Sequence, residues 1–348
     1  MKKIISALLI AILAVTLAAC GKTDVKETAS QTLQDFKIGY LASTGHILYF
    51  IAKEKGYFEE EGLNAELVLF NNSGEGITAV STGKLDAGSF GTPAPLIYIS
   101  KGNPITIIGG QMSQGHALVT KPERVQEFSD LKNFKGKTIA TIRLATGDIV
   151  FRQGLIDLGL SPKEDVKFTE MESAAAAIEA VKNGMADAAV VWTPFRKTAE
   201  AQGLSIVKYS PEIPGFENHP CCRQIANSTA VKEHPDKYEA FLRALIKAYR
   251  YYKTDQDGSI EILSKYVNID KKVLKEETYG KYVESNPDPN KPAVKDFYRY
   301  MKSVGYIDKD VDLDRNIDTS IYKNALAALL AKEPSDPIFL KLQADFKE

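Results

Sequence analysis

Two stretches of this chain repeat one another. Residues 79–93 read AVSTGKLDAGSFGTP, and residues 180–194 read AVKNGMADAAVVWTP. Ala, Val, Gly, Asp, Ala, Thr and Pro occupy the same slots in both, at an offset of 101 residues (180 − 79). Each copy predicts a helix end, a glycine that stops the helix, a short strand and a turn. A second match lies upstream, where STGH at 43–46 parallels ATGD at 145–148. We therefore expect two similar lobes.

Around the repeat, short β-prone segments alternate with segments of helical periodicity. The expected strands are 36–40, 65–70, 86–90, 105–108, 138–141, 166–168 and 188–192, and the expected helices are 47–55, 74–82, 94–100, 147–158 and 174–183. Such alternation predicts an α/β fold with mostly parallel sheets flanked by helices. From residue 233 onward the pattern becomes helical, beginning with an amphipathic segment at 236–253, and no strong strand is expected there.

The composition is that of a globular protein. Apolar residues make up 44% and charged residues 26% of the 348 residues, and the formal net charge is −1. No long basic run is present, so no nucleic-acid partner is expected. The length is sufficient for two domains of ordinary size.

The first residues have the pattern of an export signal. A short cationic start, MKK, is followed by an apolar run at 4–17, which is below the ~20 residues that a spanning helix needs. The run closes on LAACG at 17–21, which resembles the lipobox of bacterial lipoproteins. That resemblance implies a signal peptide at 1–19, a lipid on Cys20 and a polar tether to residue 35. The alternative is a plain secretory signal in which Cys20 is incidental.

Four motifs, in this order, resemble those of substrate-binding proteins of ABC importers. They are IAKEKGYFEEEGL at 51–63, AVSTGKLDAG at 79–88, DLKNFKGKTI at 130–139 and DAAVVWTP at 187–194. The resemblance is to the nitrate, taurine and aliphatic-sulfonate binders and the related thiamine-precursor binders, over about residues 36–250.

This resemblance implies a two-lobe fold of the periplasmic-binding-protein type (type II), with two hinge crossings. Lobe 1 would comprise 36–118 plus 224–348, and lobe 2 would comprise 119–223. It also implies a monomer on the extracytoplasmic face of the cell membrane, a small-molecule solute in the interlobe cleft, and ABC permease subunits as partners.

A cleft is also expected on physical grounds. Ligands of parallel α/β sheets bind beyond the carboxyl ends of the strands, where helix N-termini present unpaired N–H groups. Both copies of the repeat place a Thr-Gly or Thr-Pro turn at such a junction. Together with the resemblance, which places the turn at Thr92 and the return crossing against the ligand, this gives the residues expected to contact it: Gly45, His46, Asn72, Ser73, Thr92, Ser113, Thr146, Gly147, Asp148, Trp192, Thr193, Cys221, Cys222 and Arg223.

Several of these residues also have an ordinary structural interpretation. His46 either donates to a ligand oxygen or is a polar residue at a helix start facing solvent. Asp148, its counterpart in the repeat, would repel an anion and also suits the first turn of a helix. Asn72 and Ser73 either reach the ligand or only cap the next helix.

Trp192, the one tryptophan of the chain, either packs in a core or lines the cleft, where it offers a ring face and an N–H donor. Sulfonate binders often have an acidic residue where this chain has Thr193. That departure disfavours an amine-bearing ligand such as taurine.

The stretch NHPCCR at 218–223 falls at the expected return crossing. Cys221 and Cys222 form a vicinal disulfide, remain thiols, or bind a metal together with His219, although adjacent cysteines suit one metal poorly. Arg223 neutralises an anionic ligand or pairs with a carboxylate.

Binding is favoured over catalysis. No Gly-x-Ser-x-Gly elbow, His-Glu-x-x-His motif or phosphate-binding loop is present, and neither a cofactor nor a resident metal is expected. The expected function is therefore capture of a small polar or anionic organic solute, sulfonate-like or pyrimidine-precursor-like. Two alternatives are an enzyme on the same fold, related to thiamine-pyrimidine synthesis, and a metal carrier using His219, Cys221 and Cys222.

Overall fold

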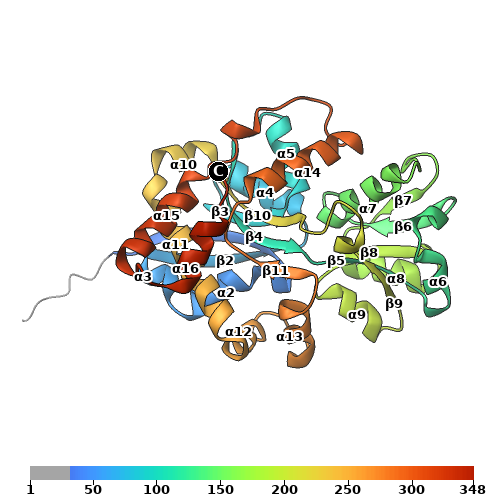
Figure 1. Cartoon of the computed structure of the whole chain (residues 1–348), viewed down its shortest axis with the longest axis horizontal. Coiled ribbons are helices and arrows are strands. Elements are labelled where there is room, and N and C mark those ends of the chain that lie inside the picture. Colours follow the sequence, from blue (N-terminus) through green and yellow to red (C-terminus); the bar gives the residue numbers. More distant parts are fainter. Residues whose placement is uncertain (1–31) are drawn as a thin grey trace, which may run out of the picture. The chain divides into compact units, whose positions relative to one another are not determined.

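Two sheets organise the chain in the computed structural model, which describes residues 32–348 (Figure 1). The strands of sheet A are β1 (Gln34–Leu41), β2 (Leu63–Phe70), β3 (Ala87–Gly91), β4 (Ile105–Gln114), β10 (Pro220–Asn227) and β11 (Val283–Ser285). The strands of sheet B are β5 (His116–Thr120), β6 (Thr138–Thr141), β7 (Lys167–Glu170), β8 (Ala188–Trp192) and β9 (Ser205–Tyr209). The expected α/β class is confirmed.

The two sheets have the same strand order. Sheet A runs β2-β1-β3-β10-β4, with β11 at its edge, and sheet B runs β7-β6-β8-β5-β9. In each sheet one strand entering from the other half of the chain, β10 or β5, lies antiparallel between the third and fourth strands of the local unit. The local strands are parallel to one another, as expected from the alternation. The sequence repeat therefore corresponds to a repeated topology.

The chain crosses between the sheets at two places. Gly115 lies between β4 and β5 with φ of +89°, a conformation that favours glycine. The chain returns between the end of β9 and the start of β10. The boundaries expected after residues 118 and 223 therefore fall inside β5 and β10, and β1 begins within the expected tether. We call the elements around sheet A lobe A and those around sheet B lobe B.

Helices cover both faces of each sheet. On lobe A, one face carries α2 (Ile47–Glu54), α3 (Tyr57–Glu60), α11 (Pro235–Thr254), α12 (Gln256–Leu263) and α15 (Ser320–Lys332), and the other carries α4 (Ser73–Ser81), α5 (Pro93–Ser100) and α14 (Lys291–Ser303). On lobe B, α6 (Val125–Phe128) and α7 (Thr146–Asp157) lie opposite α8 (Ala174–Lys182) and α9 (Phe195–Ala201). The remaining helices are α10 (Ser228–Glu233), α13 (Lys271–Tyr279) and α16 (Pro337–Asp345).

Strand β8 shows how the residues decide these layers. Ala188 and Val190 pack in one buried cluster, whereas Ala189 and Val191 pack in another on the opposite face. Successive side chains of a strand point to opposite faces, so a run of apolar residues is buried on both sides.

The repeated residues of the two copies have the same structural roles. Gly83 and Gly184 end α4 and α8 with φ of +74° and +71°. The carboxylates of Asp86 and Asp187 accept hydrogen bonds from the backbone N–H of Lys37 and of Thr138, each at 2.7 Å. These bonds tie the residue just before the third strand to the first strand in both lobes.

Several helices and strands of the structure were not predicted from the sequence. Strands β5, β9, β10 and β11 and helices α6 and α9 were not expected, since they are short or lie at the crossings. Within residues 32–348, no helix is long and apolar enough to cross a membrane. The expected signal peptide and the Cys20 lipid site lie outside the described residues.

Candidate functional site

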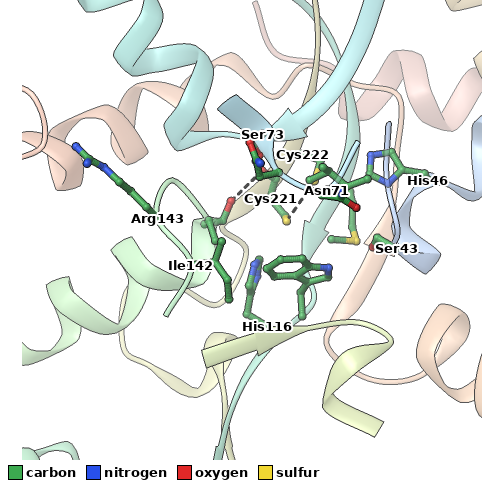
Figure 2. A pocket seen from close by; sticks show the side chains of 16 residues that line it. Ser43, His46, Asn71, Ser73, His116, Ile142, Arg143, Cys221 and Cys222 are labelled. Atoms are coloured by element: carbon green, nitrogen blue, oxygen red, sulfur yellow. Dashed lines mark hydrogen bonds between the residues drawn. The ribbon is translucent and has the colours of Figure 1, made fainter. Parts of the chain in front are cut away.

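A cavity lies where the carboxyl ends of strands from both sheets meet helix N-termini. Its empty volume is about 460 Å³, which includes the part open to solvent. The lining residues are Leu41, Ser43, His46, Asn71, Asn72, Ser73, Gly91, Met112, His116, Ile142, Arg143, Ala145, Thr146, Trp192, Cys221 and Cys222. Figure 2 shows the side chains from both lobes and β10 around one space.

Half of the residues expected to bind a ligand line this cavity. They are His46, Asn72, Ser73, Thr146, Trp192, Cys221 and Cys222. Sequence reasoning missed nine lining residues: Leu41, Ser43, Asn71, Gly91, Met112, His116, Ile142, Arg143 and Ala145. Most of these flank the same strand-to-helix turns, so naming the whole turn at each junction would have found them. A ligand contact stays a prediction for every one of these residues.

The other expected residues lie outside the lining. For three of them, the hydrogen-bonding groups of the side chain already have partners in the protein. Thr92 donates from Oγ1 to the carbonyl of Cys221 at 2.8 Å. The hydroxyl of Thr193 donates to the carbonyl of Glu277 at 3.1 Å. Asp148 is fully buried, where it pairs with Arg152 at 2.8 Å and accepts a hydrogen bond from the hydroxyl of Tyr306.

Arg223 is buried away from the cavity. Its guanidinium donates to the carbonyl oxygens of Met112, Asp288 and Pro289 at 2.7, 3.1 and 3.2 Å, and Ser113 lies beside it. Its guanidinium thus pairs with backbone carbonyls and not with a carboxylate. A role of Arg223 with an anionic ligand stays a prediction.

Gly45 and Gly147 are places of close packing. A Cβ at Gly45 would lie 1.9 Å from Sδ of Met112, and one at Gly147 would lie 2.7 Å from the ring of His116. Both glycines therefore bring a helix start close to a residue that lines the cavity.

Two neutral imidazoles face the cavity. Burial lowers the pKa of His46 to about 4, and burial together with His219 lowers the pKa of His116 to about 3. Nε2 of His46 donates to the carbonyl of Ser89 at 3.0 Å, so its Nδ1 is an acceptor, and that atom has no partner among the described residues. Nδ1 of His116 donates to the carbonyl of Gln114 at 3.2 Å, which leaves its Nε2 as an acceptor. Each ring therefore has one nitrogen that can accept a hydrogen bond.

The charge of the cavity is small. None of the described lining residues is Asp or Glu, and Arg143 is the one permanent cation among them. Figure 2 shows Arg143 extending away from the other labelled side chains. Its side chain is 69% exposed and its nearest carboxylate, on Glu170, is 4.0 Å away. No side chain in the cavity is thus placed to neutralise an anion.

The cysteine pair consists of free thiols. The sulfurs of Cys221 and Cys222 are 3.5 Å apart, too far for a disulfide, and both side chains are buried beside Met112. Burial raises the pKa of the Cys221 thiol well above its usual range. In the part of the chain that the structure describes, no group of three His, Cys, Asp or Glu residues could hold a metal ion. The expected metal alternative with His219 therefore lacks a ligand set here.

Behind the cavity, a buried polar junction joins the two lobes. Oγ of Ser43 donates to the carbonyl of Thr193 at 3.1 Å, and the hydroxyls of Thr44 and Thr193 are 2.6 Å apart. Arg196 of α9 pairs with both carboxylate oxygens of Glu277 of α13 at 3.0 and 2.8 Å, and both side chains are 2% exposed. The N-terminal turns of lobe A, the end of β8 and the C-terminal helices are thus fixed relative to one another.

Comparison with known proteins identifies a family and several relatives of this chain. The profile of the NMT1-like family matches residues 29–267. The protein named "Putative aliphatic sulfonates-binding protein" of Bacillus subtilis is 28% identical over 334 residues, covering 89% of this chain and 93% of that protein. The formylaminopyrimidine-binding protein of Halalkalibacterium halodurans is 23% identical, covering 83% of this chain and 88% of its own length.

An enzyme and a solved structure are also similar. The 4-amino-5-hydroxymethyl-2-methylpyrimidine phosphate synthase of Schizosaccharomyces pombe is 25% identical over 226 residues, covering 61% of this chain and 63% of the enzyme. The periplasmic nitrate-binding protein NrtA of Synechocystis superposes with a TM-score of 0.75 at 17% identity, covering 88% of this chain and 91% of that one. The latter likeness is evidence of the fold alone.

Proposed function

Because this chain belongs to the NMT1-like family, we propose that it is the extracytoplasmic solute-binding receptor of an ABC importer. Its solute would sit in the cavity between the lobes, and a membrane permease would receive it. Support comes from the sulfonate-binding and formylaminopyrimidine-binding relatives, which this chain matches over most of their length. The lipobox-like LAACG stretch is consistent with anchoring through Cys20.

For the solute, we propose a small uncharged heteroaromatic ring that carries N–H or O–H donors, such as an aminopyrimidine. The observation that carries this choice is the pair of neutral imidazole acceptors, His46 Nδ1 and His116 Nε2. A ring with an exocyclic amino group complements these acceptors, and the indole of Trp192 can stack on such a ring. Such an amino group is uncharged, unlike the ammonium group of taurine, so it does not need the acidic residue that Thr193 replaces. A sulfonate offers acceptors only, and Arg143, the one lining cation, points away from the cavity.

Binding accounts for the site better than catalysis does. The described lining residues include no carboxylate, so neither imidazole has an acidic partner to orient it as a general base. The similarity to a pyrimidine phosphate synthase keeps an enzyme as the second candidate. The test for that candidate is to incubate the protein with an aminopyrimidine and to look for a product by chromatography. A new product would favour the enzyme.

The test is a calorimetric titration with matched ligands. We expect 4-amino-5-hydroxymethyl-2-methylpyrimidine to bind at least tenfold more tightly than the same ring without its amino group, because each imidazole acceptor left unpaired costs about 1–3 kcal/mol. Ethanesulfonate is the anionic comparison. Tighter binding of ethanesulfonate would overturn the heteroaromatic assignment and keep the receptor, whereas no binding across sulfonates and pyrimidines would contradict solute capture.

Trp192 offers a direct mutational test. We expect Trp192→Ala to weaken binding of that pyrimidine about ten- to hundredfold, because a buried aromatic contact of this size contributes about 1–3 kcal/mol. Met185→Ala is the matched control, since Met185 lies near the start of β8, is 65% exposed and is outside the cavity. Affinity that is equal in the Trp192 and Met185 variants would exclude ring stacking at this position.

A further inference from the structure

Cys221 and Cys222 line the cavity but have no role in the proposed recognition of a heteroaromatic solute. They are the second and third residues of β10, directly after the chain returns from lobe B. Their side chains are 2% and 5% exposed, their sulfurs are 3.5 Å apart, and both line the cavity. Figure 2 shows the contact between the two sulfurs at the centre of the site. A reagent that enters the cavity therefore meets two adjacent thiols.

The backbone at this point is irregular and joins the lobes. The register of β10 on β4 shifts between Pro220 and Cys222, so Cys221 has no partner residue on β4. Its carbonyl instead accepts three hydrogen bonds, from N–H and Oγ1 of Thr92 at 2.6 and 2.8 Å and from Oγ1 of Thr146 at 3.0 Å. Thr92 belongs to lobe A and Thr146 begins α7 of lobe B. One carbonyl thus helps hold both sides of the cavity.

We propose that Cys221 and Cys222 form a reversible vicinal disulfide, and that its formation weakens solute capture. The second part rests on the proposed receptor function, and the first part does not. A disulfide needs its sulfurs about 2.05 Å apart, whereas they now lie 3.5 Å apart. Closing that gap between neighbouring residues turns the peptide that joins them, and the Cys221 carbonyl is part of that peptide. The hydrogen bonds from Thr92 and Thr146 are then lost or weakened.

The chemistry is thiol–disulfide exchange with a small disulfide, the class of oxidant found outside the cytoplasm. One thiolate of the pair attacks a sulfur of the disulfide, which breaks the S–S bond and releases one thiol. The neighbouring thiolate then attacks the mixed disulfide and releases a second thiol. In balance, one S–S bond forms in the protein, one breaks in the oxidant, and the two thiol protons pass to the two released thiols.

Disulfide formation and solute binding should oppose one another. A solute in the cavity covers the two sulfurs, so it should protect them from exchange. That protection lowers the rate of exchange. Separately, if the disulfide form binds the solute more weakly, bound solute must shift the thiol–disulfide equilibrium toward the thiols by the same factor. We expect the disulfide form to bind 4-amino-5-hydroxymethyl-2-methylpyrimidine about tenfold more weakly, the loss expected from removing one or two neutral hydrogen bonds.

The first experiment needs no solute. The full chain is treated with bis(2-hydroxyethyl) disulfide, digested and analysed by mass spectrometry, which separates the peptide with residues 221–222 from the one with Cys20. The expected product lacks two hydrogens, is restored by dithiothreitol, and exchanges the amide proton of Thr92 faster than the thiol form. A stable adduct of mercaptoethanol on either cysteine, or no reaction, would overturn the vicinal disulfide. A disulfide that forms without any change at Thr92 would overturn the link to the carbonyl.

The second experiment measures affinity for the same pyrimidine before and after treatment with the oxidant. The control is the double variant Cys221→Ser with Cys222→Ser, because a single remaining thiol would keep a mercaptoethanol adduct in the cavity. The ratio of the two affinities should be about ten in the unmodified chain and one in the variant. Equal affinities in an unmodified chain that carries the disulfide would refute the redox control. If the reduced chain binds no pyrimidine or sulfonate, the receptor proposal fails instead, while the first experiment still decides the disulfide.

Discussion

Lowering the pH from 7 to 4.5 should destabilise this protein steeply, because three histidines are buried in the neutral form. Burial lowers the pKa of His46 and of His219 to about 4 and that of His116 to about 3. An unfolded histidine has a pKa of about 6.5. Between these values the unfolded chain binds more protons than the folded chain, so the free energy of unfolding falls as the pH falls.

The expected slope is about 1.4 kcal/mol per pH unit for each such histidine between pH 6 and 4.5. Above about pH 7 the stability should be constant, because both states are then neutral at these positions. Carboxyl groups titrate mainly below this window, with ordinary pKa values near 4. Urea unfolding at a series of pH values measures the slope, and it should vanish above pH 7.

His219→Gln tests the assignment to named residues. His219 is 4% exposed, and its Nε2 lies 2.8 Å from the hydroxyl of Ser210, which glutamine can also reach. The variant should lose about a third of the slope. His234→Gln is the control, since His234 is exposed, and it should keep the full slope. Equal slopes in both variants would contradict this account of the acid sensitivity.

Removal of the Glu277 charge is expected to be the most damaging single substitution at the junction behind the cavity. Glu277→Gln leaves the guanidinium of Arg196 buried without its carboxylate, and both side chains are 2% exposed. Breaking a buried ion pair from one side costs about 3–5 kcal/mol. Nη1 of Arg196 already has no partner among the described residues, so no second acceptor compensates.

The matched control lies on the same helix. Lys275 pairs with Asp257 at 2.7 Å, with side chains 47% and 88% exposed, so Lys275→Ala should cost below about 1 kcal/mol. The double variant Arg196→Met with Glu277→Leu should recover part of the loss, because two apolar groups need no ionic partner. A cost in Glu277→Gln as small as that in Lys275→Ala, measured by urea unfolding, would show that the pair is not desolvated in solution.

The sequence alone determined the scaffold. The repeat at 79–93 and 180–194 predicted two equivalent α/β units, and its glycines and aspartates have identical roles in both lobes. The role of the glycines is local, because a helix stop depends on residues within a few positions of one another. The aspartates instead bond to a strand 49 residues away in each lobe. The end of a strand and the resemblance to binding proteins of ABC importers together suggested a cleft position for Trp192. For the cysteine pair, the resemblance alone suggested it.

Only the tertiary structure decided which polar groups are free to bind. Thr92, Thr193, Asp148 and Arg223 have the chemistry of ligand donors or acceptors, but each of them makes hydrogen bonds to segments far along the chain. His116 carried no signal of its own, and the bond from its Nδ1 to Gln114 leaves its other nitrogen as an acceptor. Hydrogen-bond partners at long sequence separation are set by packing, so no local pattern reveals which buried polar atom remains unpaired.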